Sequence, residues 1–218
     1  MRGLTVLDCS TSLSGAYCTR LFATLGAGVI CAEAPGGHPL RTAPPWVTAG
    51  PDGPVSAAWA FLAANKRSVV AAAGSAELDA LAARVDLVVL SADGDPESVR
   101  ATADRYRAAN HTLVVAVLSG FGLTGPYRAY RSSPLVDWAM GGHLLLNGEA
   151  HREPIAGAGP WSSYLGGATA TLAAQAALFR ARRHGRGDVL DVGNMEAAAA
   201  CHQWSITIYT HQGVRKTR

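Results

Sequence analysis

Residue types that mark several common protein classes are scarce in this sequence. Charged residues make up only 16% of it, and lysine occurs only at positions 66 and 216. The other basic residues are arginines, spread along the chain without a long basic run, at a net charge of +3. This distribution argues against a nucleic-acid partner and weakly favours a small anionic ligand. Because 49% of the residues are hydrophobic, disorder is excluded, and much of the surface must be apolar or covered by a partner.

Motifs that anchor common enzyme classes are also missing. The sequence has no GxxxxGK[ST] phosphate loop, no HExxH and no GxSxG, so the usual nucleotidase and hydrolase interpretations lack their central residues. The four cysteines (Cys9, Cys18, Cys31 and Cys201) form no CxxC pair, and we interpret them as buried apolar residues and expect no metal. No signal-peptide pattern follows Met1, and residues 161–179 are too rich in Ala and Gly for a membrane span. We therefore expect a cytoplasmic protein.

Short apolar runs alternate with helical patterns along the first half of the chain. The expected strands cover residues 4–8, 29–33, 68–72, 86–90 and 112–118, with a last strand at 188–192. The expected helices between them cover residues 15–25, 75–83 and 96–109. Because parallel strands need crossover connections, this alternation predicts an α/β fold, a parallel sheet with helices on both faces. Prolines and glycines interrupt every pattern over residues 39–54, which predicts an irregular surface loop.

Small residues dominate the second half of the chain. Residues 162–183 follow a long Ala-rich helical pattern, in which small residues recur every three or four positions, at Gly166, Ala170, Ala174 and Ala177. Such a stripe lets another backbone approach closely, so we expect this helix to be buried. We expect a last helix over residues 194–210, capped by Asn194.

The opening of the chain invites comparison with dinucleotide-binding folds. A strand, a helix and a second strand ending in Glu33 stand in the order in which such folds place a carboxylate on a ribose. The turn at residues 12–16, however, supplies one glycine where that site needs three. We therefore reject a dinucleotide site.

Five stretches spread over the whole chain carry the pattern of a known family. They are GLTVLD at 3–8, GAYCTRL at 15–21 followed by LGAGVICAEAPGG at 25–37, NKRS at 65–68, SGFGLTGPY at 119–127, and GRGDVLDV at 185–192. In this order they resemble the class III CoA-transferases, the family of formyl-CoA transferase, the carnitine CoA-transferases and α-methylacyl-CoA racemase. The resemblance implies a Rossmann-like core, followed here by long Ala-rich helices, and an active site shared between two chains that interlock as rings.

The resemblance also implies that coenzyme A, or an acyl-CoA, binds along the edges of the strands. The expected CoA-binding residues are Arg41, Lys66, Arg67, Gly120, Phe121, Gly122 and Gly125. The three cations suit phosphates, with which they form charge-assisted hydrogen bonds. The glycines suit a close approach of the backbone to a ligand, and the alternative is that they only form a tight turn.

The residue that performs catalysis in the family is replaced here. The resemblance implies an aspartate that attacks the acyl-CoA thioester and forms a mixed anhydride, three residues after a proline. After Pro160 that position holds Ser163, and an alcohol forms no anhydride. The racemase branch needs a histidine before its Ala-Met-Gly stretch, where this chain has Ser133 or Pro134, followed by Asp137. Both chemistries therefore lack their central residue.

Two further departures concern a charge and the extent of the pattern. The family's Asn-Phe-Arg falls on residues 91–93, so Asp93 puts an anion where relatives carry a cation near CoA. That change should weaken or move the binding of CoA. The chain also covers roughly the first half of the family pattern. We interpret residues 1–192 as a Rossmann-like, CoA-binding portion of the large domain, and residues 193–218 as a helix and tail leading toward a second domain.

These observations leave three hypotheses about function. In the first, the chain is an oligomeric subunit of a split or heteromeric CoA-transferase-like enzyme, in which another chain supplies the missing half or the catalytic carboxylate. In the second, it is a noncatalytic CoA-binding or scaffolding partner, a pseudoenzyme. In the third, it is an active enzyme of altered chemistry that uses Ser163, Asp137 or another residue. We prefer the first, because the low charged fraction fits a fold whose apolar side is covered.

Overall fold

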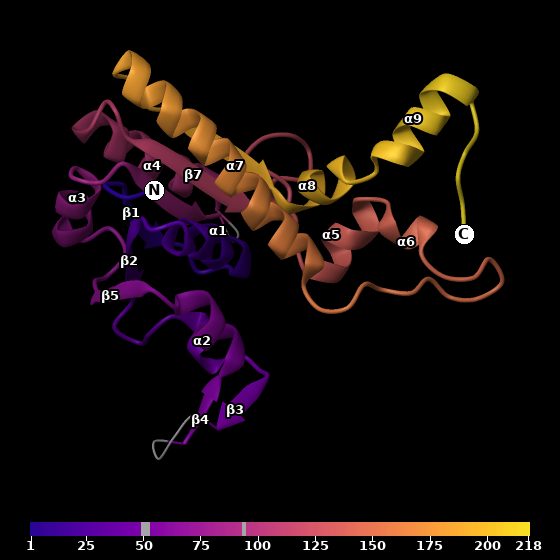
Figure 1. Cartoon of the computed structure of the whole chain (residues 1–218), viewed down its shortest axis with the longest axis horizontal. Coiled ribbons are helices and arrows are strands. Elements are labelled where there is room, and N and C mark those ends of the chain that lie inside the picture. The colour runs from indigo at the N-terminus through magenta and orange to yellow at the C-terminus, as the bar shows by residue number, and fades with distance from the viewer. Residues whose placement is uncertain (49–52, 93–94) are drawn as a thin grey trace.

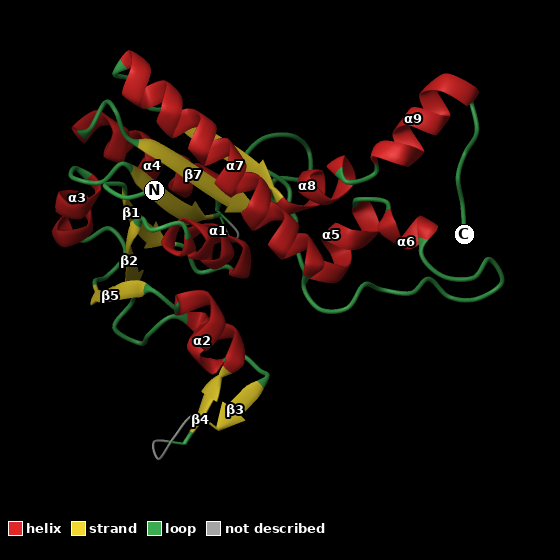
Figure 2. Cartoon of the chain, viewed as in Figure 1, coloured by secondary structure: helices red, strands yellow, loops and turns green. Residues whose placement is uncertain are grey.

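Helices cover both faces of a parallel sheet in the computed structural model, which describes residues 1–48, 53–92 and 95–218 (Figures 1 and 2). The strands of this sheet are β1 (Thr5–Cys9), β2 (Gly28–Glu33), β5 (Lys66–Val70), β6 (Leu87–Ser91), β7 (Val114–Ser119) and β8 (Val189–Gly193). They pair in parallel in the order β5-β2-β1-β6-β7-β8. This is the strand order of doubly wound nucleotide-binding folds, so the predicted Rossmann-like α/β fold is confirmed.

Successive strand residues build separate cores on the two faces of the sheet. One core contains Val6, Leu87 and Val114, and the other contains Leu7, Val88 and Val115. The first core is closed by α1 (Leu13–Thr24) and α7 (Trp161–His184). The second is closed by α3 (Ala76–Ala82) and α4 (Pro96–Ala109). Because both faces are covered, the central strands are continuous apolar runs rather than alternating ones.

Small residues let α7 pack closely against its neighbours, as the sequence predicts. A β-carbon added to Gly167 would lie 2.5 Å from the carbonyl oxygen of Ser14 in α1. A β-carbon added to Gly166 would overlap Asn194, the first residue of α8 (Asn194–Ala200). The helix is buried on one face only, since the side chains of Leu172 and Phe179 remain exposed.

Three predictions about the elements are wrong. Residues 194–210 do not form one helix: the chain turns at Cys201 and His202 between α8 and α9 (Gln203–Gln212). Asn194 does not cap α8, because Gly193 occupies the N-cap and Asn194 is buried. Cys201 is exposed rather than buried.

The predicted irregular loop over residues 39–54 contains regular structure. It begins with the 3-10 helix η1 (Pro39–Thr42), and β3 (Trp46–Thr48) pairs with β4 (Pro54–Ser56) in a hairpin. Residues 49–52 of this loop lie outside the described residues. Three short helices were also not predicted: α2 (Ala57–Ala63), α5 (Pro134–Met140) and α6 (His143–Leu146). In the ranges that the structure describes, no helix is long and apolar enough to span a bilayer.

Candidate functional site

A cavity of about 380 Å³ opens at the carboxyl end of the sheet, and we call it the switch-point cavity. The residues that line it follow β1, β6 and β7 or lie just before α5 and at the start of α8. β1 and β6 are neighbours in the sheet, but the helices that follow them, α1 and α4, cover opposite faces. Ligands of open α/β sheets bind in the crevice at this kind of switch point, so this cavity is the candidate site.

Uncharged and cationic hydrogen-bonding groups belong to the described residues that line the switch-point cavity. They include the hydroxyls of Ser12, Ser14, Ser119 and Ser132, the amide of Asn194, and the guanidinium groups of Arg128 and Arg131. The side chain of Phe121 and backbone of Gly120 complete one wall. Among the described residues that line the cavity, none is Asp, Glu, His or Cys. In the described part of the chain, no cluster of three such residues could hold a metal ion.

Serine hydroxyls hold the turn after β1, where dinucleotide folds carry glycines. Ser12 Oγ accepts a hydrogen bond from the N–H of Gly15 at 3.2 Å and so caps α1. The hydroxyl of Ser91, at the end of β6, donates to Ser12 Oγ at 2.7 Å and accepts from the Ser12 N–H at 3.2 Å. These bonds join the turn after β1 to the end of β6, beside the cavity that Ser12 lines.

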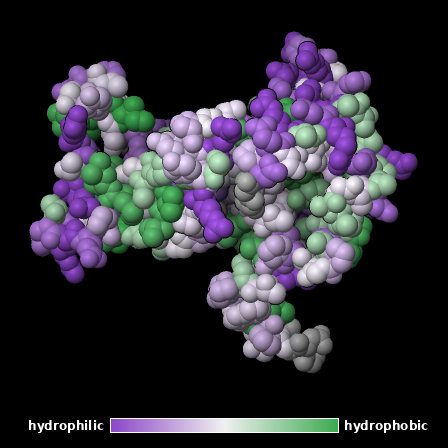
Figure 3. Space-filling view, turned by 180° about the vertical axis from the view of Figure 1, so that it is seen from behind, coloured by the Kyte–Doolittle hydropathy of each residue, from purple (hydrophilic) through white to green (hydrophobic). Residues whose placement is uncertain are grey.

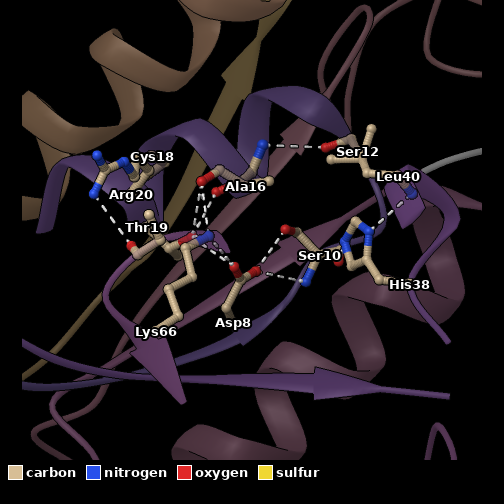
Figure 4. A network of polar contacts seen from close by, with 12 residues as sticks. Asp8, Ser10, Ser12, Ala16, Cys18, Thr19, Arg20, His38, Leu40 and Lys66 are labelled. Atoms are coloured by element: carbon tan, nitrogen blue, oxygen red, sulfur yellow. Dashed lines mark hydrogen bonds and ion pairs between the residues drawn. The ribbon is translucent and has the colours of Figure 1, made fainter. Parts of the chain in front are cut away.

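A buried ion pair anchors the same turn from within the fold (Figure 4). Lys66 Nζ donates to Asp8 Oδ2 at 3.0 Å, to the carbonyl of Ala16 at 2.9 Å and to Thr19 Oγ1 at 2.7 Å. Asp8 Oδ1 accepts from the N–H and the hydroxyl of Ser10 at 3.1 and 2.6 Å. The side chains of Lys66 and Asp8 are 3% and 0% exposed. All three ammonium donors are therefore used, and none is left for a phosphate.

The other two predicted phosphate ligands also lie away from the switch-point cavity. Arg41 donates from Nε and Nη2 to the Glu33 carboxylate at 2.6 and 2.8 Å, and its guanidinium stacks on Trp59. The pKa of Glu33 is lowered to about 2, chiefly by the hydrogen bonds from Arg41. Arg41 keeps three donors for a ligand. Arg67 is exposed beside Gly28 at the amino end of β2, the edge of the sheet opposite the cavity.

The sequence left two roles open for the glycines of residues 120–125, a close approach to a ligand or a tight turn. Gly120 and Phe121 line the switch-point cavity, whereas Gly122 and Gly125 do not. A β-carbon on Gly120 would overlap the side chain of Ser132, so this glycine allows a close approach within the protein. Gly122 and Gly125 both have φ of +83°, a conformation that favours glycine in a tight turn.

The two candidate catalytic residues are both buried, and neither lines the switch-point cavity. Asp137 is 1% exposed, and its carboxylate accepts hydrogen bonds from Ser132 at 2.6 Å and from Ser162 at 3.3 Å. Burial raises the pKa of Asp137 above its usual range. Ser163, next along α7, is 8% exposed, and its hydroxyl has no hydrogen-bond partner in the described part of the chain. Asp93 lies outside the described residues.

Sequence reasoning missed most of the residues that line the switch-point cavity. Ser12 and Ala92 follow predicted strands, so the rule that ligands bind beyond strand carboxyl ends was a usable signal. Ser132 and Asn194 reach the cavity only through the packing of α5 and α8 on α7, and no local pattern marks them.

A doubly wound parallel sheet with helices on both faces places the chain in the Rossmann-like class of α/β proteins. The chain belongs to CoA-transferase family III, whose family model matches residues 1–218.

Curated relatives extend this assignment. The chain is 33% identical over 199 residues to the succinyl-CoA:(R)-benzylsuccinate CoA-transferase subunit BbsE of Thauera aromatica, covering 89% of this chain and 48% of that protein. It is 33% identical over 214 residues to the succinyl-CoA–D-citramalate CoA-transferase of Chloroflexus aurantiacus, covering 95% and 52%. The chain thus spans about half the length of the curated relatives it matches.

A solved structure has the same fold. A CAIB/BAIF family protein from Brucella suis superposes with a TM-score of 0.91 at 26% identity. The match covers 99% of this chain and 58% of that chain.

Proposed function

We propose that this chain binds a CoA thioester in the switch-point cavity and works as a subunit of a CoA-transferase-like enzyme whose catalytic carboxylate comes from another chain. The observation that carries the proposal is Ser163, a neutral hydroxyl at the position where the family resemblance expects the nucleophilic aspartate. Relatives named as subunits support a multi-chain assembly, among them BbsE and the alpha subunit of a succinyl-CoA–L-malate CoA-transferase of Chloroflexus aurantiacus.

The exposed apolar surface supports a partner chain. Trp204 is 78% exposed, Leu172 71% and Phe179 69%. Side chains of this size contribute most to stability when they are removed from water.

The test is CoA transfer by the protein isolated from its own cells, with any subunit that copurifies. Exchange of labelled succinate into succinyl-CoA is a suitable assay, because several relatives are named for succinyl-CoA. We expect Ser163→Ala to change the exchange rate less than twofold, since this hydroxyl forms no covalent intermediate. Loss of exchange in Ser163→Ala would instead make Ser163 the catalytic group.

A noncatalytic CoA-binding role is the second candidate, favoured because none of the described residues that line the cavity carries a carboxylate. It predicts that the isolated protein and its partners bind CoA without any exchange. Under the first proposal, Ser163→Asp is tolerated in the active assembly. If exchange is absent and Ser163→Asp does not create it, loss of the nucleophile alone is an insufficient explanation.

A further inference from the structure

Ser132 presents a hydroxyl of fixed orientation to the switch-point cavity. Its side chain lines the cavity, and its Oγ donates to Asp137 Oδ1 at 2.6 Å, a short distance typical of a bond to a carboxylate. A serine hydroxyl has one hydrogen to donate and two lone pairs. With the hydrogen held by Asp137, the oxygen faces the cavity as an acceptor only.

The position of this oxygen is fixed from two further sides. Ser132 packs so closely on Gly120 that no β-carbon fits there. Asp137 is held in turn by Ser162 in the first turn of α7, at 3.3 Å. The acceptor therefore has a defined place and direction before any ligand arrives, which reduces the entropic cost of binding.

An acceptor in this place needs a ligand that donates. The thioester carbonyl and the phosphates of an acyl-CoA have only acceptor atoms. Its donors are two amide N–H groups and one hydroxyl in the pantetheine arm, the adenine amino group and a ribose hydroxyl, and of these the amides lie nearest the thioester. We propose that Ser132 accepts a hydrogen bond from a pantetheine amide N–H, and that Asp137 is the positioning residue that keeps Ser132 in the acceptor state. This inference rests on the proposed binding of a CoA thioester in the switch-point cavity.

The same geometry argues against Asp137 as a nucleophile. The carboxylate is 1% exposed, does not line the cavity, and has both oxygens engaged by serine hydroxyls. Attack on a thioester requires an oxygen in contact with the ligand, and Ser132 stands between. Asp137 therefore acts on the ligand through lining residues that it contacts, first of all Ser132.

Two ligands make it possible to test the pantetheine arm and the nucleotide part of CoA separately. Coenzyme A carries the arm, and adenosine 3′,5′-bisphosphate lacks it. We expect Ser132→Ala to weaken the binding of coenzyme A about fivefold, as for one hydrogen bond lost, and to leave the binding of adenosine 3′,5′-bisphosphate unchanged. Isothermal titration calorimetry on the protein with any copurifying subunit measures both.

Asp137→Asn and Ser162→Ala complete the experiment. The side-chain amide introduced by Asp137→Asn can donate to Ser132 Oγ and turn the serine hydrogen toward the cavity, so we expect a similar loss for coenzyme A and no added loss in the double variant with Ser132→Ala. Ser162→Ala removes another partner of Asp137 that is 0% exposed. Because Ser162 affects the ligand only by holding Asp137, its loss for coenzyme A should be smaller than that of Ser132→Ala. Thermal unfolding of each variant checks that the fold is intact.

The outcomes distinguish this inference from the function on which it rests. Unchanged affinity for coenzyme A in Ser132→Ala, or an equal loss for both ligands, overturns the pantetheine contact and leaves the CoA site standing. Additive losses in the double variant overturn the positioning role of Asp137. Failure of the unaltered protein to bind either ligand overturns the CoA site itself and this inference with it.

Discussion

Lys66 is the residue whose role the structure changes most. Its ammonium is buried and is bonded to Asp8, Thr19 and the carbonyl of Ala16. Removal of one partner from a buried pair leaves an uncompensated charge, so we expect Lys66→Met to lower the free energy of unfolding by about 3 to 5 kcal/mol. Urea denaturation measures the loss. The double variant with Asp8→Asn should recover part of it.

Arg67 supplies the matched control. It lies next to Lys66 in β5 but is exposed, so Arg67→Met should change the unfolding free energy by less than about 0.5 kcal/mol. Equal effects of the two substitutions would contradict the structural role of the Asp8–Lys66 pair.

The ionisation of Glu33 should make the free energy of unfolding depend on pH in the acid range. Its pKa of about 2 in the folded chain lies below the ordinary 4.5, first because of the hydrogen bonds from Arg41. A carboxylate with a lowered pKa stabilises the fold fully above about pH 4.5, and this stabilisation is lost as the pH falls toward 2. Because Arg41 is half exposed, solvent screening reduces the contribution to about 2 kcal/mol.

The measurement for Glu33 is the difference in unfolding free energy between about pH 6 and about pH 3. Glu33→Gln should lose about 2 kcal/mol less over this range than the unaltered protein. Glu97→Gln is the control, because the Glu97 side chain is 78% exposed. A loss in Glu33→Gln equal to that of the unaltered protein would show that another group governs the acid response.

The sequence indicated which residues matter near β5 but not what each of them does. The pair Lys66-Arg67 was predicted to contact phosphate, yet neighbouring residues of a strand point to opposite faces of the sheet. That rule alone predicts that the side chains of Lys66 and Arg67 lie on different faces of the sheet. Which of them is buried depends on Asp8 and Thr19, which belong to elements far away in the sequence, so local patterns could not decide it.

At the scale of elements, the contact of α7 with α1 depends on Gly167. A β-carbon there would lie 2.5 Å from the carbonyl oxygen of Ser14. Overpacking of this kind costs about 1 to 3 kcal/mol, which outweighs the gain of about 1 kcal/mol in helix propensity. We expect Gly167→Ala to destabilise the fold in thermal or urea unfolding, and to narrow the switch-point cavity that Ser14 lines.

Ala168→Gly calibrates helix propensity at the adjacent, exposed position of α7. It should destabilise by about 1 kcal/mol without any clash. If Gly167→Ala were to stabilise the chain by the amount that Ala168→Gly costs, the close helix contact would be refuted.

Elements marked by local periodicity were predictable, and those shaped by tertiary contacts were not. The bounds of α4 agree with the predicted 96–109, because Asp95 caps the helix and Pro96 begins it. The break between α8 and α9 has no Gly or Pro to mark it. His202, at this break, packs against His143 of α6 at a ring distance of 3.8 Å, a contact that the sequence does not reveal.

At the scale of the whole molecule, the fold class followed from the sequence but the place of the site did not. Alternating strands and helices predicted a parallel sheet. The strand order decides where the switch point lies, and that order depends on which face each helix covers. β1 and β6 are adjacent although 77 residues separate the end of one from the start of the other. The cavity between them is therefore a property of topology rather than of a motif.

The end of the molecule that carries α9 leads to the last prediction. Seen from behind, hydrophobic side chains gather over the end formed by α5, α6 and α9 (Figure 3). Trp204 and Ile206 of α9 are 78% and 55% exposed, and Leu145 of α6 is 58% exposed. Exposed large apolar residues that cluster in this way mark an interface with another protein. We expect the native mass of the protein from its own cells, with CoA added, to exceed 22.6 kDa plus one CoA.

Substitutions that introduce charge on α9 should dissociate that assembly. Trp204→Lys with Ile206→Lys should return the mass to 22.6 kDa, because a lysine buried at an interface carries a large desolvation cost. Gln203→Lys, on the exposed polar start of the same helix, should leave the assembly intact. A second chain in the complex supports the split-enzyme proposal and identifies where to seek the carboxylate. A homo-oligomer that binds CoA favours a CoA-binding protein, and a monomer would contradict the interface and the need for a partner together.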